Sequence, residues 1–218
     1  ASFVIMDQKT GEVKAISGGR GEKTASLTLN RASNTLRQPG SAFKILTAFA
    51  PALDTCGATL GTVYYDAPYS IGSKSFSNWY SSGYQGYSSI RDGIIYSMNI
   101  VAVRCLMETV TPQLGVEYAK NFGITSLTST DYNPALALGG ITDGVSNLEL
   151  TGSYATIANG GIYTKPRFFT RILDHDGKVL IDNTPETHRV LKDSTAFLLT
   201  DAMAGSMISS RKFSKSGS

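Results

Sequence analysis

Apolar and polar residues alternate over two short segments near the beginning of the chain, as they do in strands with one buried face. Residues 3–7 form a short apolar run, and residues 12–17 alternate polar and apolar side chains. Residues 8–11 between them have the composition of a turn that ends in glycine. We predict a β-hairpin over residues 3–17, and a second over residues 171–181, where two strand-like runs flank an Asp-His-Asp-Gly turn.

Five other segments carry apolar residues at helical spacing. The segment after Pro39-Gly40 is rich in good helix formers, and the segment after Ser146 has Glu149 in place for a capping box. The latter helix should stop at Asn159-Gly160-Gly161, because glycine favours the end of a helix. The predicted helices cover residues 41–53, 89–106, 112–122, 147–160 and 193–203.

Residues 55–90 differ from the rest because they are rich in Gly, Ser, Tyr and Asn and carry few charges. We interpret this segment as loops and short strands that line a cleft. Trp79 and Tyr80 are candidates for the wall of that cleft, although aromatic side chains there could equally pack in the interior.

Composition and charge limit the function classes. With 218 residues, 41% apolar and 17% charged, the chain can bury a sizeable core, and no repeat or linker divides it. The net charge of +3 and the lack of a long Lys/Arg run give no support for nucleic-acid binding. No apolar run is long enough for a membrane span, no signal peptide begins at Ala1, and Gly18-Gly19-Arg20-Gly21 lacks the rest of a phosphate loop.

The two cysteines do not indicate a metal site. Cys56 and Cys105 form no C-x-x-C motif, and His175 and His188 stand far from both in the sequence. Their apolar neighbours predict buried free thiols, with a disulfide between them as the alternative. We predict no metal and no cofactor.

The strongest candidate chemistry lies in residues 37–44, where Ser41 and Lys44 are one helical turn apart and share a helix face. A serine hydroxyl needs a base, and a lysine becomes one when burial lowers its pKa. The helix start also offers Ser41 a backbone N–H for a developing oxyanion. The alternative is an ordinary helix start with Lys44 in solvent, so the pair needs support from the rest of the chain.

That support comes from a second motif, Ser97-x-Asn99. Ser-x-x-Lys followed by Ser-x-Asn is the pattern of penicillin-binding proteins and serine β-lactamases. Over nearly all of its length the chain resembles the transpeptidase domain of class A, bifunctional penicillin-binding proteins. The further segments that carry this resemblance are Asp7–Val13, Asn30-Arg31-Ala32, Arg37–Lys44, Leu138-Gly139-Gly140 and Ser153–Gly161.

The resemblance implies an α+β fold, with an antiparallel sheet flanked by helices and a mostly helical region. We expect the hairpins at 3–17 and 171–181 to pair in that one sheet, near the strand that carries the family's third motif. It implies a serine D,D-transpeptidase that cross-links peptidoglycan stem peptides ending in D-Ala-D-Ala and is acylated by β-lactams, at the extracytoplasmic face of the bacterial membrane. Ser41 would be the nucleophile, Lys44 the base, and Ser97 a proton relay, while Asn99 would bind the substrate amide and help hold Lys44. The predicted substrate contacts are Gly40, Trp79 and Tyr80.

Two departures from the family pattern shape the expectations. The third family motif, Lys-Thr/Ser-Gly, should lie on a strand, whereas Lys215-Ser216-Gly217 falls in a low-complexity run just before Ser218. We therefore interpret residues 1–218 as a partial domain, completed by a second polypeptide segment that carries the motif. The alternative is that Lys215-Ser216-Gly217 is itself the third motif. The family's glycosyltransferase domain and membrane anchor are also absent from this sequence, and we expect them in a longer parent protein.

Other functions on the same fold stay open at this stage. A D,D-carboxypeptidase or a β-lactamase would use water as the final acceptor, but no deacylating residue can be assigned among Glu108, Glu117 and Glu149. A β-lactam-sensing or peptidoglycan-binding module that does not turn over is the alternative outside enzymes. A Ser-His-Asp hydrolase lacks its G-x-S-x-G motif.

Overall fold

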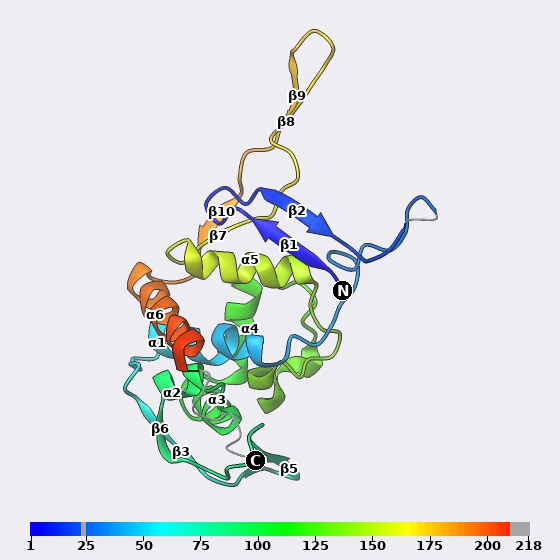
Figure 1. The fold of residues 1–218 in the computed structure, drawn as a ribbon. Helices are drawn as coiled ribbons and strands as arrows, with labels where there is room; N and C mark the ends of the chain where they lie inside the picture. Colours follow the sequence, from blue (N-terminus) through cyan, green and yellow to red (C-terminus); the bar gives the residue numbers. More distant parts are fainter. Residues whose placement is uncertain (23–24, 210–218) are drawn as a thin grey trace.

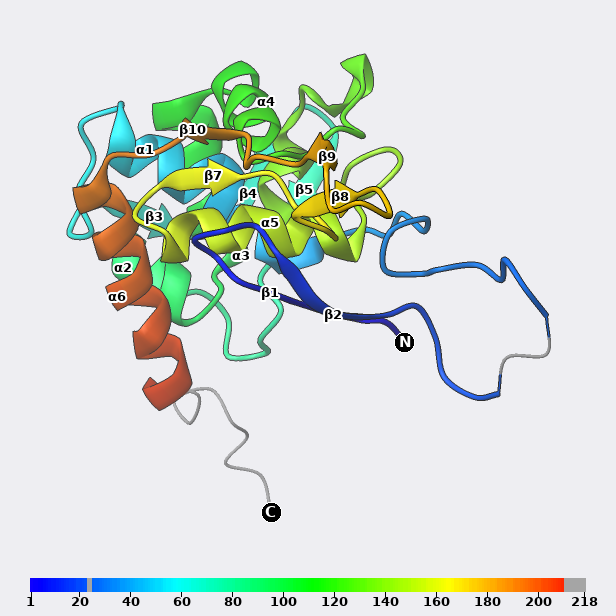
Figure 2. The same ribbon diagram turned by 90° about the horizontal axis from the view of Figure 1, so that it is seen from above.

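The fold is built in layers around a helical body. The computed structural model describes residues 1–22 and 25–209. Helix α5 (Asn147–Ala158) covers one side of that body, and the hairpin of β1 (Phe3–Met6) and β2 (Val13–Ser17) lies over α5 (Figures 1 and 2). The hairpin of β8 (Arg171–Leu173) and β9 (Val179–Asp182) projects beyond this layer. The α+β class and both predicted hairpins are therefore confirmed.

The helix predicted after Gly40 lies at the centre of the body. It begins as a 3-10 turn at Gly40–Ala42, continues through the π-helix η2 (Ile45–Phe49) and ends in α1 (Ala50–Asp54). Every residue from Phe43 to Ala50 is buried. Apart from Lys44 and Thr47, the residues of this segment are apolar and face all sides, as in a core helix. The start of this helix is therefore anchored in the most tightly packed part of the molecule.

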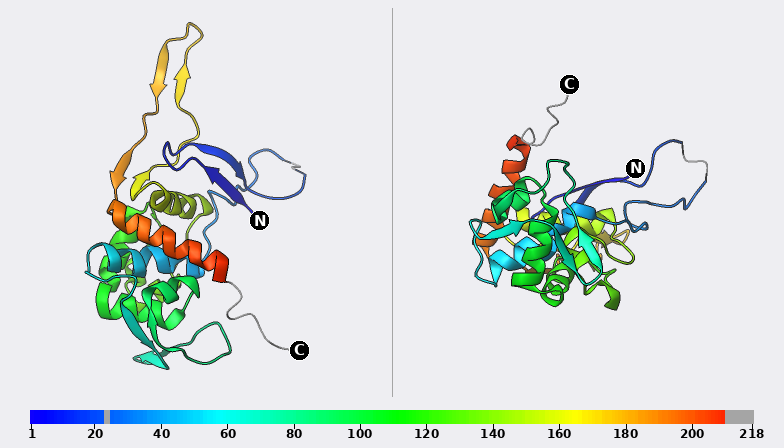
Figure 3. Two further views of the ribbon diagram at one scale, coloured as in Figure 1. Left: turned by 60° about the vertical axis from the view of Figure 1, so that its left-hand side comes forward. Right: turned by 90° about the horizontal axis from the view of Figure 1, so that it is seen from below.

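The other helices surround this one. Helix α4 (Pro112–Asn121) matches its prediction, and α5 has the predicted capping box between Ser146 and Glu149. Helix α6 (Asp193–Ser209) runs beyond the expected end at Met203, and it contacts α1, α2 and α5 (Figure 3). No helix in the described residues is both long enough and apolar enough to cross a bilayer.

The predicted continuous helix over residues 89–106 is wrong, because the structure interrupts it. Helix α2 (Ile90–Ile95) stops at Tyr96, and α3 (Asn99–Arg104) begins three residues later and continues into the π-helix η3 (Cys105–Val110). Ser97, between them, has a φ of +50°, in the left-handed region that non-glycine residues rarely adopt. The apolar pattern runs unbroken through the interruption, so spacing alone could not reveal it.

The strands pair locally. Within the described residues they form five two-stranded antiparallel sheets, which include β3 (Val63–Asp66) with β6 (Gly86–Ser89), β4 (Tyr69–Ile71) with β5 (Lys74–Phe76), and β7 (Ile162–Thr164) with β10 (Thr187–Arg189). The expectation that the hairpins at 3–17 and 171–181 join one sheet is wrong for this part of the chain. A parallel bridge between Glu12 and Arg167 instead ties the first hairpin to the segment before the second.

Three sequence features have simple outcomes. Cys56 and Cys105 are free thiols, so the disulfide alternative is wrong; Cys105 is buried and Cys56 is partly exposed. Residues 55–90 form the short strands and loops that their composition predicts. Lys215-Ser216-Gly217 lies outside the described residues.

Candidate active site

Ser41 lies at the exposed start of the central helix. Gly40 before it has a φ of +57°, which its lack of a side chain permits, and the chain turns there into the buried helix. Within the described residues the hydroxyl of Ser41 makes no hydrogen bond. An exposed hydroxyl on an anchored backbone is the arrangement that a nucleophile needs.

The turn that carries Ser41 is held by the segment of residues 139–145. Arg37 and Val145 exchange backbone hydrogen bonds of 2.9 and 2.8 Å. The side-chain amide of Gln38 accepts a hydrogen bond from the backbone N–H of Ile141 at 3.0 Å and donates one to the carbonyl oxygen of the same residue. These contacts fix the backbone just before Ser41.

Lys44 is buried, and its ammonium group is surrounded by neutral oxygen atoms. Its side chain reaches the break between α2 and α3, where Nζ donates to Ser97 O at 2.6 Å, to Ser97 Oγ at 3.0 Å and to Asn99 Oδ1 at 2.6 Å. Among the described residues, no carboxylate forms an ion pair with it. Burial without a counter-charge lowers the pKa of Lys44 from its ordinary value to about 7.

The left-handed turn at Ser97 explains how one residue offers two acceptors to Lys44. Because Ser97 has a positive φ, its carbonyl oxygen and its hydroxyl both face Nζ. The hydroxyl can also donate a proton, whereas the carbonyl cannot. Ser97 is thus suited to pass a proton to or from Lys44.

Asn99 completes the contacts of Lys44 and is itself held by the loop after β5. Its side-chain Nδ2 donates to the carbonyl oxygen of Ser77 at 2.8 Å, which leaves Oδ1 directed at Lys44. Its backbone N–H donates to Asn78 Oδ1 at 3.0 Å. Asn99 therefore has its backbone and its amide plane fixed at once.

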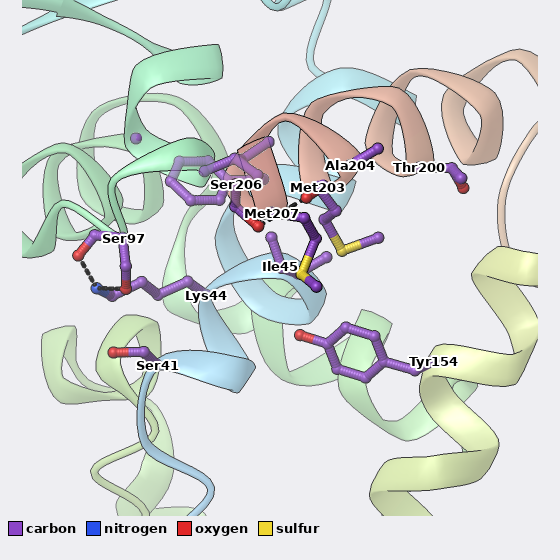
Figure 4. A pocket seen from close by; sticks show the side chains of 13 residues that line it. Ser41, Lys44, Ile45, Ser97, Tyr154, Thr200, Met203, Ala204, Ser206 and Met207 are labelled. Carbon is purple, nitrogen blue, oxygen red and sulfur yellow. Dashed lines mark hydrogen bonds between the residues drawn. The ribbon is translucent and has the colours of Figure 1, made fainter. Parts of the chain in front are cut away.

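A cavity of about 520 Å³ opens beside these groups. Ser41, Lys44, Ser97 and Tyr154 line one part of it, and side chains of α6, among them Met203 and Met207, line another (Figure 4). The Tyr154 hydroxyl donates to the carbonyl oxygen of Ala42 at 2.7 Å, and burial raises the pKa of this tyrosine well above its usual range. Tyr154 therefore braces the helix turn next to Ser41 as a neutral phenol.

The structure brings four of the seven predicted site residues into one cluster: Ser41, Lys44, Ser97 and Asn99. Gly40 lies beside them, and exposed Trp79 donates from Nε1 to the carbonyl oxygen of Tyr96 at 3.0 Å, next to Ser97. Tyr80 has a different place, because it is buried and its hydroxyl donates to Asp66 Oδ2 at 3.0 Å. We therefore correct the interpretation of Tyr80 as a cleft residue and assign it to the interior.

Sequence reasoning missed Tyr154 and Asp66, and it gave Asn78 no role beyond a place in the cleft-lining stretch of residues 55–90. Tyr154 occurs in a segment that carried the family resemblance, but no pattern connected its hydroxyl to the backbone of Ala42. Asp66 and Asn78 lie in the Gly-, Ser- and Tyr-rich stretch, where isolated polar residues look like ordinary loop residues. An Asp at the end of a run of β-forming residues was the single available signal.

Comparisons with known proteins identify related chains. Residues 1–211 match the family model described as "Penicillin binding protein transpeptidase domain". The chain is 36% identical over 218 residues to Penicillin-binding protein 1A of Clostridium acetobutylicum. The matched region covers 94% of this chain and 26% of that protein. It is 38% identical over 199 residues to Penicillin-binding protein 1F of Bacillus subtilis, which covers 91% of this chain and 27% of that protein.

A solved structure gives the same result for the fold. The structure of Penicillin-Binding Protein 1A from Haemophilus influenzae superposes with a TM-score of 0.80 at 26% sequence identity, and it covers 100% of this chain and 36% of that one. The chain thus spans about a quarter of the length of the two curated relatives named above.

Proposed function

Because this chain belongs to the transpeptidase domain family of class A penicillin-binding proteins, we propose that it is a serine D,D-transpeptidase acting through an acyl-enzyme on Ser41. The observation that carries this proposal is the buried lysine beside an exposed serine. Lys44 has a pKa of about 7 and contacts both members of the Ser97-x-Asn99 motif. A base poised near neutral pH is what nucleophilic attack by a hydroxyl requires.

The first chemical step forms one bond and breaks another. Ser41 Oγ attacks the carbonyl carbon of the penultimate D-Ala, and its proton passes to neutral Lys44. The C–N bond to the terminal D-Ala then breaks, and the leaving nitrogen receives a proton through the hydroxyl of Ser97, which contacts Lys44 Nζ. The amine of a neighbouring stem peptide resolves the ester by the reverse sequence of proton transfers, and this forms the cross-link.

The remaining residues act by position and charge. The backbone N–H of Ser41 donates to the developing oxyanion, and Asn99 binds the amide of the stem peptide while its Oδ1 holds Lys44. Gly40 precedes Ser41, and Trp79 contacts the carbonyl oxygen of Tyr96 next to Ser97, so we predict that both contact the substrate. A β-lactam mimics D-Ala-D-Ala, and its carbonyl acylates Ser41 when the C–N bond of the ring opens. The ring nitrogen stays attached to the acyl group, so the whole antibiotic remains on the enzyme.

The setting of the whole protein is also a proposal. The relatives of which this chain covers about a quarter are named as penicillin-binding proteins 1A and 1F. We place the domain at the extracytoplasmic face of the bacterial membrane, within a larger class A protein that is membrane-anchored and carries a glycosyltransferase domain. In that setting the stem peptides of peptidoglycan are its substrates.

The test is covalent labelling with benzylpenicillin, measured by intact mass spectrometry, of the protein with the expected segment that carries the third motif present. We expect the full mass of the antibiotic to be added to the unchanged protein and to Ser73→Ala, a matched variant of an exposed serine in the β4–β5 turn. Ser41→Ala should carry no adduct. An adduct on Ser41→Ala, or none on the unchanged protein, would overturn the proposal, and rapid release of the adduct would favour a β-lactamase.

A further inference from the structure

A buried carboxylate lies behind the candidate active site without contacting it. Asp66, the last residue of β3, is 1% exposed. Its Oδ1 accepts from Asn78 Nδ2 at 2.8 Å, and its Oδ2 accepts from the Tyr80 hydroxyl at 3.0 Å and from the backbone N–H of Gln85 at 2.8 Å. In the described part of the chain it forms no ion pair. A buried charge satisfied by neutral donors is costly to keep, so its place calls for an explanation.

The charge of Asp66 determines which way the amide of Asn78 faces. An ionised carboxylate can only accept hydrogen bonds, so Asn78 must turn its NH₂ group towards Asp66. Its oxygen then faces the opposite way, where it accepts the backbone N–H groups of Asn99 at 3.0 Å and Ile100 at 3.3 Å. This contact substitutes for a cap at the start of α3, because the N-cap residue Met98 offers no side-chain hydrogen bond.

The same loop therefore holds Asn99 at two points. Asn78 fixes its backbone, and the carbonyl oxygen of the neighbouring Ser77 accepts from its side-chain Nδ2 at 2.8 Å. The free oxygen of that side chain contacts Lys44 Nζ at 2.6 Å. A continuous chain of hydrogen bonds thus leads from the buried carboxylate to the candidate base.

We propose that Asp66 and Asn78 are positioning residues, which orient Asn99 and so hold the amine of Lys44 beside Ser41. This inference rests on the proposed function, since it assigns a purpose to the placement of Lys44. A merely structural role would tie the loop of residues 77–85 to β3 and leave the reactivity of Lys44 unchanged.

The decisive variant is Asp66→Asn, which has nearly the same shape but presents one donor and one acceptor. The oxygen of the introduced amide accepts the hydrogen bonds of Tyr80 and Gln85, so its NH₂ group faces Asn78. The side chain of Asn78 must then flip. Its own NH₂ group now points at the backbone N–H groups of Asn99 and Ile100, which it cannot accept. Asn99 then loses one of its two anchors, the one that holds its backbone. We expect benzylpenicillin acylation to slow by about tenfold to a hundredfold, since small misplacements of reacting groups have effects of this order.

The pH profile distinguishes positioning from loss of stability. Ser97 and Asn99 supply the polar contacts of Lys44, and Tyr154 is the other titratable group lining the cavity in the described residues. Losing the Asn99 acceptor removes a hydrogen bond that favours the ammonium form, so the pH midpoint of acylation should fall, by on the order of one unit. Tyr64→Phe, which deletes a partly buried hydrogen bond between the same strand and Thr109, should leave the midpoint unchanged.

Exchanging the two residues provides a rescue. In Asp66→Asn/Asn78→Asp, the new amide donates to the new carboxylate, which accepts from Asn99 and Ile100, so every hydrogen bond of the chain is restored. The acylation rate should return to within about threefold of the unchanged protein, a strong departure from additivity for contacting residues. The midpoint should return to its original value or lie above it, because the negative charge is then nearer to Lys44.

The outcomes separate this inference from the proposed function. If the unchanged protein acylates on Ser41 but Asp66→Asn keeps the original midpoint, or if the exchange fails to restore the rate, the positioning role is wrong and the proposed function survives. If Asp66→Asn does not fold, the exchanged variant decides alone, and its failure to fold or to acylate counts against the inference. If Ser41→Ala still carries the adduct, the proposed function itself is wrong.

Discussion

At the scale of single residues, the unusual feature is a lysine buried without an acidic partner. The three hydrogen bonds of Lys44 Nζ match the three donors of an ammonium group. Deprotonation leaves Nζ with one lone pair and two N–H groups. The two N–H groups can still donate to Ser97 O and Asn99 Oδ1, and the Ser97 hydroxyl can donate to the lone pair instead of accepting. The site can therefore hold either protonation state without breaking its geometry.

Acylation should depend on pH through Lys44. Only the neutral amine takes a proton from Ser41, and burial lowers the pKa of Lys44 to about 7. The second-order rate constant for benzylpenicillin should rise with pH and reach half its maximum near pH 7. Lys44→Arg, which holds its proton too strongly to act as a base, should acylate about a hundredfold to ten-thousandfold more slowly at every neutral pH. Normal acylation by Lys44→Arg would mean that another group is the base.

The lowered pKa of Lys44 also makes the free energy of unfolding depend on pH. Between about pH 7 and the ordinary lysine value, the unfolded chain binds the proton of Lys44 and the folded chain does not. The contribution of this group to the free energy of unfolding therefore increases as pH rises through that interval. Below about pH 7 both states are protonated, and burial of the charge destabilises the fold by its full amount.

Residue identities could be predicted at the site, but their surroundings could not. Ser41, Lys44, Ser97 and Asn99 follow from two short motifs, whose letters are read directly from the sequence. The left-handed backbone of Ser97 and the buried carboxylate of Asp66 arise from tertiary packing, which no local pattern encodes. Tyr80 was misassigned for the same reason, because an aromatic residue in a polar stretch has no periodicity to show which way it faces.

At the scale of elements, the Ser41 turn fits against a glycine from another segment. A Cβ atom built at Gly139, the residue that ends the 3-10 helix η5 (Pro134–Leu138), would lie 2.4 Å from the carbonyl oxygen of Gly40. Real Cβ atoms do not come this close, so the two backbones are in contact because one side chain is missing. The position of Ser41 thus depends on Gly139.

Gly139→Ala should therefore slow acylation by more than its effect on stability explains. The added methyl group displaces the turn before Ser41, and a displacement of about 1 Å costs on the order of a hundredfold in rate. Gly177→Ala is the matched control, since Gly177 has a similar φ of +82° with no atom within 4 Å. In both variants alanine occupies a position of positive φ, so both should lose a similar amount of stability in a thermal melt. Equal acylation rates in the two variants would contradict the role given to Gly139.

Local patterns predicted elements better than their assembly. The capping box at Ser146 and the turn at Gly177 depend on neighbouring residues, and both elements form where the sequence places them. Pairing between the distant hairpins at 3–17 and 171–181 depends on long-range packing, and in the described residues it does not occur. The extent of α6 was underestimated, because the small and polar residues after Met203 gave no apolar pattern to follow.

At the scale of the whole molecule, the β8–β9 hairpin stands apart from the body that carries the site (Figures 1 and 3). Every residue of both strands is exposed, including apolar Leu173, Leu180 and Ile181. The backbone N–H of Asn183 donates to the carbonyl oxygen of Thr170 at 2.9 Å at the base of the hairpin. The base is therefore closed independently of the strands.

Replacing residues 171–182 by Asn-Gly should leave the domain intact. This dipeptide forms a tight turn, and the hydrogen bond between Thr170 and Asn183 already has the geometry that such a turn closes. We expect the acylation rate to change by less than about threefold, and the stability by about 0.5 kcal/mol or less, because exposed residues contribute little. A rate loss beyond tenfold would show that the hairpin supports the site.

The break at Ser97 also affects how the molecule folds. Helix α2 has six residues, and isolated helices of this length do not persist in water. The turn between α2 and α3 can therefore exist only once buried Met98 and its neighbours have packed into the core. A molecule that is partly unfolded in this region has no reactive centre at all, instead of a weakened one. Covalent labelling of Ser41 would consequently count folded molecules, and the yield of adduct would report the fraction of molecules with a natively packed core.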